Sequence, residues 1–159
     1  VNYVLVNLGI LDKPYNFLTQ PFAAKMVIIL ALLWRWTGYN MVFFLSGLQN
    51  IEYSVYEAAK IDGASAIQTF FKITVPLLKP TILLTAIMST NGTLQLFDES
   101  INLTDGGPAN ASISMSHYIY NLCFKYVPNF GYAAAMSFFI LLLVAVLAFI
   151  QMRVGDKRD

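Results

Sequence analysis

Residues 133–152 read AAAMSFFILLLVAVLAFIQM, and no charged side chain interrupts them. A helix needs about 20 mostly apolar residues to cross the hydrocarbon core of a bilayer, where its backbone hydrogen bonds must be closed within the segment. The run therefore predicts a transmembrane helix over residues 132–152, with lipid as its solvent.

The composition of the whole chain agrees with a membrane setting. Of its 159 residues, 57% are hydrophobic and 12% are charged, and the mean hydropathy is +0.60. A soluble domain carries about 25% charged residues, so this chain has too little polar surface to cover a globule. The net charge of +1 gives no sign of a nucleic-acid partner, and the single cysteine, Cys123, excludes an internal disulfide framework. We predict an all-α, polytopic transmembrane fold in contact with lipid.

Two further segments are long enough to span a bilayer. Residues 26–48 contain the runs MVIILALLW and MVFFLSGL, with Arg35 between them. Residues 81–97 begin as TILLTAIM and turn polar after Met88. We therefore expect three spans, with residues 1–159 forming part of one transmembrane domain. The chain starts without methionine or a signal-peptide pattern, so we expect it to be the C-terminal part of a longer membrane protein.

Lysine and arginine in the connections predict the orientation. Two crossings separate the connection after the first span from the C-terminal tail, so both lie on one side; they carry Lys60, Lys72, Lys79, Arg153, Lys157 and Arg158. The other side carries Lys13, Lys25 and Lys125. Cytoplasmic connections are enriched in these residues. The loop over residues 52–76 is therefore expected in the cytoplasm and the loop over residues 98–131 outside it.

The outer loop has two local signals. Asp105-Gly106-Gly107-Pro108 predicts a tight turn. The segment from His117 to Val127 spaces its aromatic residues as a short helix would. His117 is the only histidine, so we expect no metal site there.

The cytoplasmic loop contains the longest polar interruption on its side of the spans, EAAKIDG at residues 57–63. Spacings of three and four predict a short helix over residues 52–59. It should expose the carboxylate of Glu57, and the small side chains of Ala58 and Ala59 would let another protein's backbone come close. Gly63 can adopt the left-handed conformation that ends a helix.

A second short helix is expected after this turn. Ala64 and Ser65 precede the run AIQTFFKI, and Pro76 and Pro80 are expected to break the chain before the next span. The residues alone are compatible with two interpretations of this helix pair. The helix pair could be an amphipathic anchor on the membrane surface, or a rigid knob that fits a groove on a soluble partner.

The segment resembles the cytoplasmic loop motif of ABC importer permeases, Glu-Ala-Ala, three residues, Gly, nine residues, Ile-x-Leu-Pro. The chain matches it at Glu57, Ala58, Ala59, Gly63, Ile73 and Pro76, and departs by Val75 in place of leucine. Further matches to the carbohydrate-uptake subgroup include residues 36–39, 48–51, 103–108 and 131–135. The resemblance covers nearly the whole chain and implies the C-terminal half of a six-span permease core in a bacterial plasma membrane.

This resemblance implies a role for the loop and a set of partners. The residues expected to couple the loop to an ATPase are Glu57, Ala58, Ala59, Asp62 and Gly63. The chain has no Walker-type phosphate-binding loop, so ATP and Mg²⁺ would be bound by a separate ATP-binding subunit dimer and no cofactor by this chain. A second homologous permease and an extracytoplasmic sugar-binding protein complete the expected assembly.

The substrate path is expected on the polar faces of the first two spans, because polar groups in membrane helices normally face the bundle interior or water. On the second span, Ser89, Thr93 and Leu96 lie at spacings of four and three, beside Gly92. The resemblance extends this set to Trp34, Gly38, Met41, Ser89, Gly92, Thr93 and Leu96. The competing explanation for each small polar residue is packing between helices.

Two other functions remain to be weighed. An ion-gradient-driven carrier or channel would show inverted repeats with broken helices near the midplane, and no repeat is visible. A membrane enzyme would need paired carboxylates, a metal cluster or a nucleophile–base set, and the sequence shows none. We therefore expect a transport subunit that is not an enzyme, without a prediction of which sugar it carries.

Overall fold

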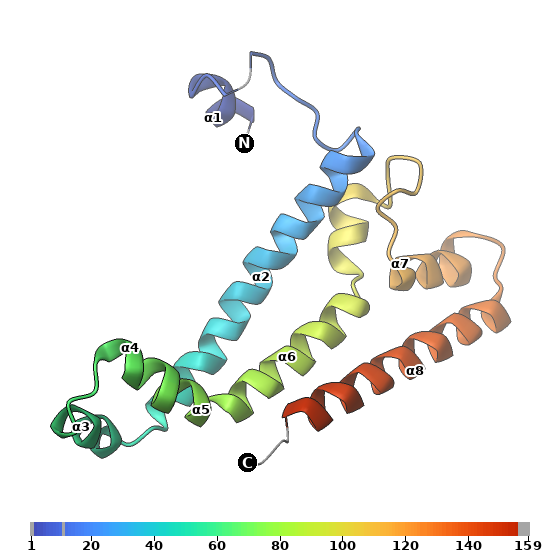
Figure 1. Ribbon diagram of the computed structural model, residues 1–159. Coiled ribbons are helices and arrows are strands. Elements are labelled where there is room, and N and C mark those ends of the chain that lie inside the picture. The colour runs from blue at the N-terminus through green and yellow to red at the C-terminus, as the bar shows by residue number, and fades with distance from the viewer. Residues whose placement is uncertain (1, 11, 156–159) are drawn as a thin grey trace. The chain divides into compact units, whose positions relative to one another are not determined.

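The computed structural model describes residues 2–10 and 12–155, so the predicted tail charges Lys157 and Arg158 lie outside the described residues. The described chain consists of helices and connections, with no strand among these residues, which confirms the predicted all-α fold (Figure 1). Its elements are α1 (Asn2–Asn7), α2 (Pro21–Gln49), α3 (Tyr53–Ile61), α4 (Ala66–Thr69), η1 (Phe70–Thr74), α5 (Val75–Leu77), α6 (Lys79–Leu94), η2 (Ser100–Thr104), α7 (Met115–Tyr120), η3 (Asn121–Lys125) and α8 (Phe130–Gly155).

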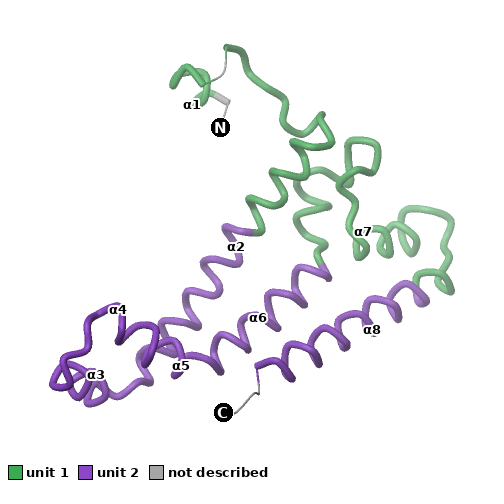
Figure 2. The backbone as a smooth tube through the Cα atoms, in the orientation of Figure 1, with its two compact units in different colours: residues 1–32, 96–133 green, residues 33–95, 134–159 purple. Residues whose placement is uncertain are grey.

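The chain divides into two compact units (Figure 2). Unit 1 comprises residues 1–32 and 96–133, and unit 2 comprises residues 33–95 and 134–159. Helices α2 and α8 each contribute residues to both units. The cytoplasmic loop predicted from the sequence and the facing parts of α2, α6 and α8 all belong to unit 2.

Helices α2 and α8 contain the first and third predicted spans. With 29 and 26 residues, both are long and apolar enough to cross a membrane. Helix α2 begins at Pro21, five residues before the predicted span, because proline is favoured in a first turn, where its missing N–H costs nothing. Most of their side-chain surface is exposed within this chain, which leaves it free for lipid or another subunit.

The prediction for the second span is wrong at its end. Helix α6 stops at Leu94, three residues short of the predicted boundary, and Gln95 leaves helical geometry with φ −96° and ψ 20°. The polar run before it contains threonine, asparagine and glycine, which form helices weakly. With 16 residues α6 does not meet the length of a span by itself; it does so only together with residues 66–77, from which it is bent by 65°.

The predicted break before the second span is present, but it lies at Leu78, between Pro76 and Pro80. Each proline lies in the first turn of a helix, α5 or α6, where its ring is tolerated. The chain therefore stays helical through Pro76 and bends at Leu78 instead.

Three five-residue π-helical segments, η1, η2 and η3, were not expected from the sequence. In η3, the amide of Tyr126 donates over 2.8 Å to the carbonyl of Asn121, five positions earlier in the sequence. The helix predicted from His117 to Val127 is thus α7 followed by η3. Such segments add one residue to a turn and shift the side chains that follow.

Within unit 2, α6 lies between α2 and α8 (Figures 1 and 2). Toward α8, Gln151 Nε2 donates to Thr90 Oγ1 over 2.8 Å. Toward α2, Gly47 packs against Leu78 and Thr81, so that a Cβ atom built on Gly47 would lie 2.8 Å from Leu78 Cδ2. Small residues let membrane helices approach closely, and polar side chains then bond across the contact.

Candidate functional site

The predicted cytoplasmic loop begins with α3, which starts one residue later and ends two residues later than the expected helix. Glu57, Ala58 and Asp62 are exposed, and exposure was predicted for the first two. Ala59 is not, because only 5% of it is accessible. The expectation that both alanines offer space to a partner is therefore wrong for Ala59, whose small side chain packs inside the loop.

The turn after α3 is formed as expected. Gly63 has φ +76°, a conformation that is strained for residues with a side chain. Its amide donates to the carbonyl of Lys60 over 3.1 Å, and the amide of Ala64 donates to the carbonyl of Ala59 over 2.9 Å. These two bonds form a Schellman motif, which satisfies carbonyl groups that the end of a helix would otherwise leave open.

The second helix of the loop is closed at its start by Ser65. The amide of Gln68 donates to Ser65 Oγ over 3.3 Å, and the amide of Ser65 donates to Gln68 Oε1 over 2.9 Å. This reciprocal arrangement is a capping box. The sequence predicted the helix start at Ala64 and Ser65, and the structure makes Ser65 the capping residue.

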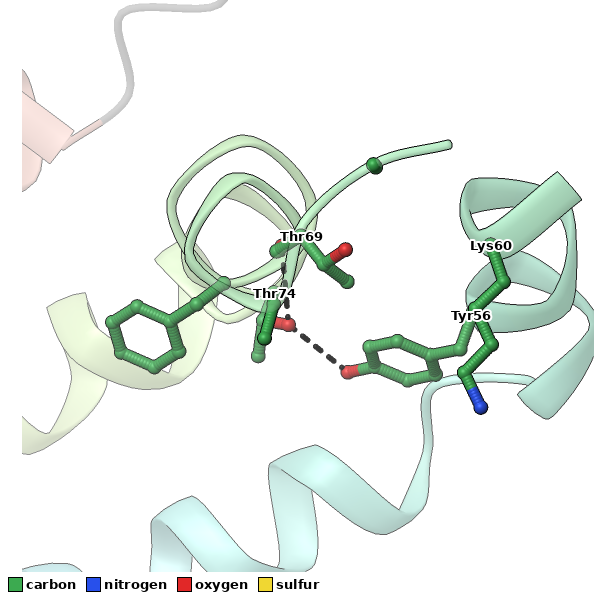
Figure 3. A pocket seen from close by; sticks show the side chains of 7 residues that line it. Tyr56, Lys60, Thr69 and Thr74 are labelled. Atoms are coloured by element: carbon green, nitrogen blue, oxygen red, sulfur yellow. Dashed lines mark hydrogen bonds between the residues drawn. The ribbon is translucent and has the colours of Figure 1, made fainter. Parts of the chain in front are cut away.

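A side-chain hydrogen bond ties the two arms of the loop together (Figure 3). Tyr56 of α3 and Thr74 of η1 are joined by 3.2 Å between their hydroxyl oxygens, and Thr74 Oγ1 in turn donates to the carbonyl of Thr69 over 3.5 Å. Beside this bond lies an open cavity of about 360 Å³, lined by Tyr56, Lys60, Ala64, Ala66, Thr69, Phe70 and Thr74. The loop is therefore an internally bonded corner rather than a free connection.

The outer surface of this corner is partly apolar. Tyr53, Ile61, Ile67, Phe70 and Phe71 are between 51% and 85% exposed. Such a surface can be covered by lipid or by protein, so both interpretations of the loop remain compatible with its shape.

The predicted path residues of α2 share one exposed face. Trp34 is 85% and Met41 55% exposed, and a Cβ atom built on Gly38 would meet nothing within 4 Å. At 3.6 residues per turn, this face is directed away from the α2 residues that contact α6, including Trp36. In the described part of the chain this face is therefore open.

The predicted path residues of α6 face elsewhere. Ser89 bonds to Asn40 of α2, with Asn40 Nδ2 donating to Ser89 Oγ over 3.0 Å. Gly92 lies against the ring of Trp36, whereas Thr93 is exposed. The structure thus brings Ser89 and Gly92 to the contact between α2 and α6, and not to the exposed face of α2.

Two differences from the sequence prediction follow. Leu96 lies beyond the end of α6, so the expectation that it shares a helical face with Ser89 is wrong. Asn40 was not among the predicted site residues. The signal that could have found it is an amide in an otherwise apolar span, because such a group needs a polar partner inside the bundle.

The outer loop contains a buried polar cluster that the sequence did not predict. Ser100 and His117 are both 0% exposed. Ser100 Oγ donates to the carbonyl of Ser112 over 2.8 Å and therefore accepts from His117 Nδ1 over 2.9 Å. The opposite ring nitrogen, His117 Nε2, lies 3.6 Å from Asp105 Oδ1. Asp105 Oδ1 also accepts from Lys125 Nζ over 2.7 Å.

This cluster does not form a catalytic triad, although it contains serine, histidine and aspartate. The Ser100 hydroxyl is buried, and its hydrogen is donated to a backbone carbonyl, so it cannot attack a substrate. Burial lowers the pKa of His117, while the hydrogen bond from Lys125 lowers the pKa of Asp105 and raises the pKa of Lys125 itself. In the described part of the chain, no three His, Cys, Asp or Glu residues are grouped to hold a metal ion.

Comparison with known families gives a match over residues 3–158. The matching family is described as "Binding-protein-dependent transport system inner membrane component". The match covers nearly every element of the structure, including the loop from α3 to α5.

Individual relatives agree with this match. The chain is 54% identical over 160 residues to a lactose transport system permease protein of Rhizobium radiobacter, covering 99% of this chain and 54% of the relative. It is 36% identical over 157 residues to a trehalose/maltose transport system permease protein of Thermococcus litoralis, covering 99% and 52%. The chain thus spans about half the length of these curated relatives.

A solved structure of similar fold is the crystal structure of a bacterial alginate ABC transporter in complex with an alginate pentasaccharide-bound periplasmic protein. The TM-score is 0.83 at 26% sequence identity, and the match covers 98% of this chain and 54% of that one. The likeness extends over both compact units.

Proposed function

Because the chain belongs to the family of binding-protein-dependent transport system inner membrane components, we propose that it is part of a permease subunit of an ATP-driven sugar importer. The family match over residues 3–158 carries this proposal. The same membership makes the chain an inner-membrane protein, in agreement with its apolar helices.

The proposed substrate class is sugars, either mono- or oligosaccharides. It is supported by relatives whose names specify lactose and trehalose/maltose. The helices of one such chain cannot enclose a pathway alone, so a second, homologous permease would supply the opposite wall. The exposed face with Trp34, Gly38 and Met41 is available for that contact or for substrate.

The proposed coupling element is the loop from α3 to α5. Its two arms are fixed by the Gly63 turn, the Ser65 capping box and the bond between Tyr56 and Thr74. A corner held in this way can carry a rigid-body movement from a soluble subunit to α6. Glu57, Ala58, Asp62 and Gly63 would contact the ATP-binding subunit, on which ATP and Mg²⁺ bind.

An extracytoplasmic binding protein is the third proposed partner. The family description itself specifies dependence on a binding protein, and a related alginate transporter was solved with one. The alternative of a carrier driven by an ion gradient lacks comparable support, because the relatives found are ABC permeases.

The proposal is tested in the intact permease, expressed with its ATP-binding subunit and binding protein. Replacing Glu57→Lys and Gly63→Pro should abolish sugar uptake while the subunits still accumulate in the membrane. Proline cannot adopt the φ of +76° found at Gly63. Asp12→Lys, an exposed charge change outside the loop, is the matched control. Uptake at the wild-type rate in the double variant would contradict the coupling role, and uptake without ATP would contradict the proposed function.

A further inference from the structure

The contact between α2 and α6 contains a reciprocal side-chain pair, Asn40 and Ser89. Asn40 Nδ2 donates to Ser89 Oγ over 3.0 Å, and Ser89 Oγ lies 3.2 Å from Asn40 Oδ1, to which it donates. Both residues are half-buried and lie 49 residues apart in sequence. The pair therefore joins two membrane helices at a defined point.

The two side chains differ in how many hydrogen-bonding groups they have left once this pair has formed. A hydroxyl has one hydrogen, and the Ser89 hydrogen is used on Asn40 Oδ1. The amide of Asn40 has two N–H groups and two carbonyl lone pairs, of which the pair uses one each. Asn40 can therefore still both donate a hydrogen bond to a third molecule and accept one from it.

The pair is bordered by exposed polar side chains on one side. Thr93 follows Ser89 by one turn, Thr37 precedes Asn40 by three residues, and both are exposed. At 3.6 residues per turn, and with the two helices antiparallel, Thr37 and Thr93 lie on the same flank of the contact. Arg35 lies on the opposite flank by the same geometry. The accessible flank is therefore uncharged, and the exposed Met41 lies on it one turn after Thr37.

We propose that Asn40 is a positioning and specificity-determining residue of the substrate path. It holds the Ser89 hydroxyl against α2 and offers its remaining N–H and carbonyl to a hydroxyl of a neutral sugar. A sugar hydroxyl both donates and accepts, which matches the two groups that the amide has left. This inference rests on the proposed function as a sugar permease.

The first test asks whether the pair exists in the membrane. In the intact permease with Cys123→Ser, the variants Asn40→Cys and Ser89→Cys are combined and oxidised. A disulfide between α2 and α6 is expected, because the two native side chains touch. The matched control combines Asn40→Cys with Thr85→Cys, since Thr85 bonds only to carbonyls of its own helix. Failure of the first combination to cross-link would overturn the inference.

The second test separates positioning from simple packing. Uptake of radiolabelled lactose, maltose and trehalose is measured, and the sugar that the wild type imports is used. Asn40→Ala and Ser89→Ala should each raise KM for uptake about 5- to 30-fold with kcat nearly unchanged, as the loss of a buried hydrogen bond predicts. Thr85→Val should leave KM unchanged, because the hydroxyl that it removes bonds to carbonyls of its own helix.

The third test exchanges the partners. The double variant with Asn40→Ser and Ser89→Asn keeps a bond between the helices but moves the amide to α6. If the Asn40 amide must bind the sugar from its position on α2, this variant should restore the amount of protein in the membrane but leave KM for uptake raised. Recovery of the wild-type KM would show that the pair only joins the helices and would overturn the inference.

Substrate protection supplies a measurement that does not depend on turnover. In the Cys123→Ser background, alkylation of Asn40→Cys should slow several-fold when the imported sugar and binding protein are added. Unchanged alkylation would overturn the inference while leaving the proposed function intact. Uptake that proceeds without ATP would instead contradict the proposed function, and this inference with it.

Discussion

Gly92 of α6 lies directly against the indole ring of Trp36 in α2: a Cβ atom built on Gly92 would fall 2.6 Å from Cη2 of that ring. No side chain can be added there unless Trp36 moves. The two residues fix how closely the helices approach near the Asn40–Ser89 pair.

The first prediction concerns this contact. Gly92→Ala should destabilise the folded permease by about 1–3 kcal/mol, the usual cost of overpacking, and a second change, Trp36→Leu, should recover part of the loss. The measurement is the thermal unfolding of the detergent-solubilised permease. Gly38→Ala is the control for stability, because its Cβ would meet nothing within 4 Å. Equal melting temperatures for the two alanine variants would contradict the predicted contact.

The second prediction concerns the turn in the cytoplasmic loop. The left-handed conformation costs a residue with a side chain about 1–2 kcal/mol, and this cost is smallest for asparagine. At Gly63, asparagine should therefore retain more sugar-dependent ATP hydrolysis than alanine, and alanine more than valine. The hydrolysis is measured in the reconstituted complex. Gly131→Ala serves as the comparison, since its nearest neighbour would be 3.9 Å away. An order that follows side-chain size alone, with alanine above asparagine, would exclude a backbone origin.

The third prediction concerns the bond across the loop. Tyr56→Phe removes a hydroxyl that bonds to Thr74, so the arms should separate more often, with a cost of about 0.5–1.5 kcal/mol. Cleavage by trypsin after the exposed Lys60 should then become about 2- to 10-fold faster. Tyr53→Phe removes a hydroxyl from the exposed face of the same helix and should leave cleavage unchanged. If trypsin cuts both variants at the wild-type rate, the bond between Tyr56 and Thr74 does not hold the arms of the loop together.

The fourth prediction is a pH dependence that arises in the outer loop. Burial lowers the pKa of His117 below its ordinary value of 6.5, so the folded loop favours the neutral ring. The resulting stability is present above 6.5 and is lost as the pH falls below that value. The carboxylate of Asp105 opposes this loss and the ammonium of Lys125 adds to it.

The melting temperature of the permease should accordingly fall between about pH 7 and about pH 5. In His117→Asn, whose amide can still donate to Ser100, the part of this fall that depends on histidine should disappear. Identical pH profiles for the wild type and His117→Asn would show that another group titrates in this range.

The sequence was most informative where one physical requirement dominates. Residues 132–152 must be helical because lipid offers no partner for their backbone, and α8 contains them all. Gly63 was predicted to be left-handed from its position after a helical run, and its φ of +76° agrees. In both cases the local sequence is sufficient.

Features that depend on contacts between distant residues were missed. The burial of Ala59 and the pairing of Asn40 with Ser89 follow from packing that spacing along one helix does not reveal. The end of α6 at Leu94 depends on a balance of weak propensities in a polar run, so its boundary and the placement of Leu96 were wrong. The roles assigned to the coupling loop and to the substrate path remain predictions.

The shortness of α6 has a consequence for hydration. Its 16 residues rise about 24 Å, whereas the hydrocarbon core is about 30 Å thick. Residues 95–97 beyond its outer end are not helical, although the amide of Gln95 still donates to the carbonyl of Asn91 over 3.1 Å. Open amides at membrane depth are tolerated only beside protein or water. The outer end of α6 is therefore a place for water or for another part of a protein, and not for lipid.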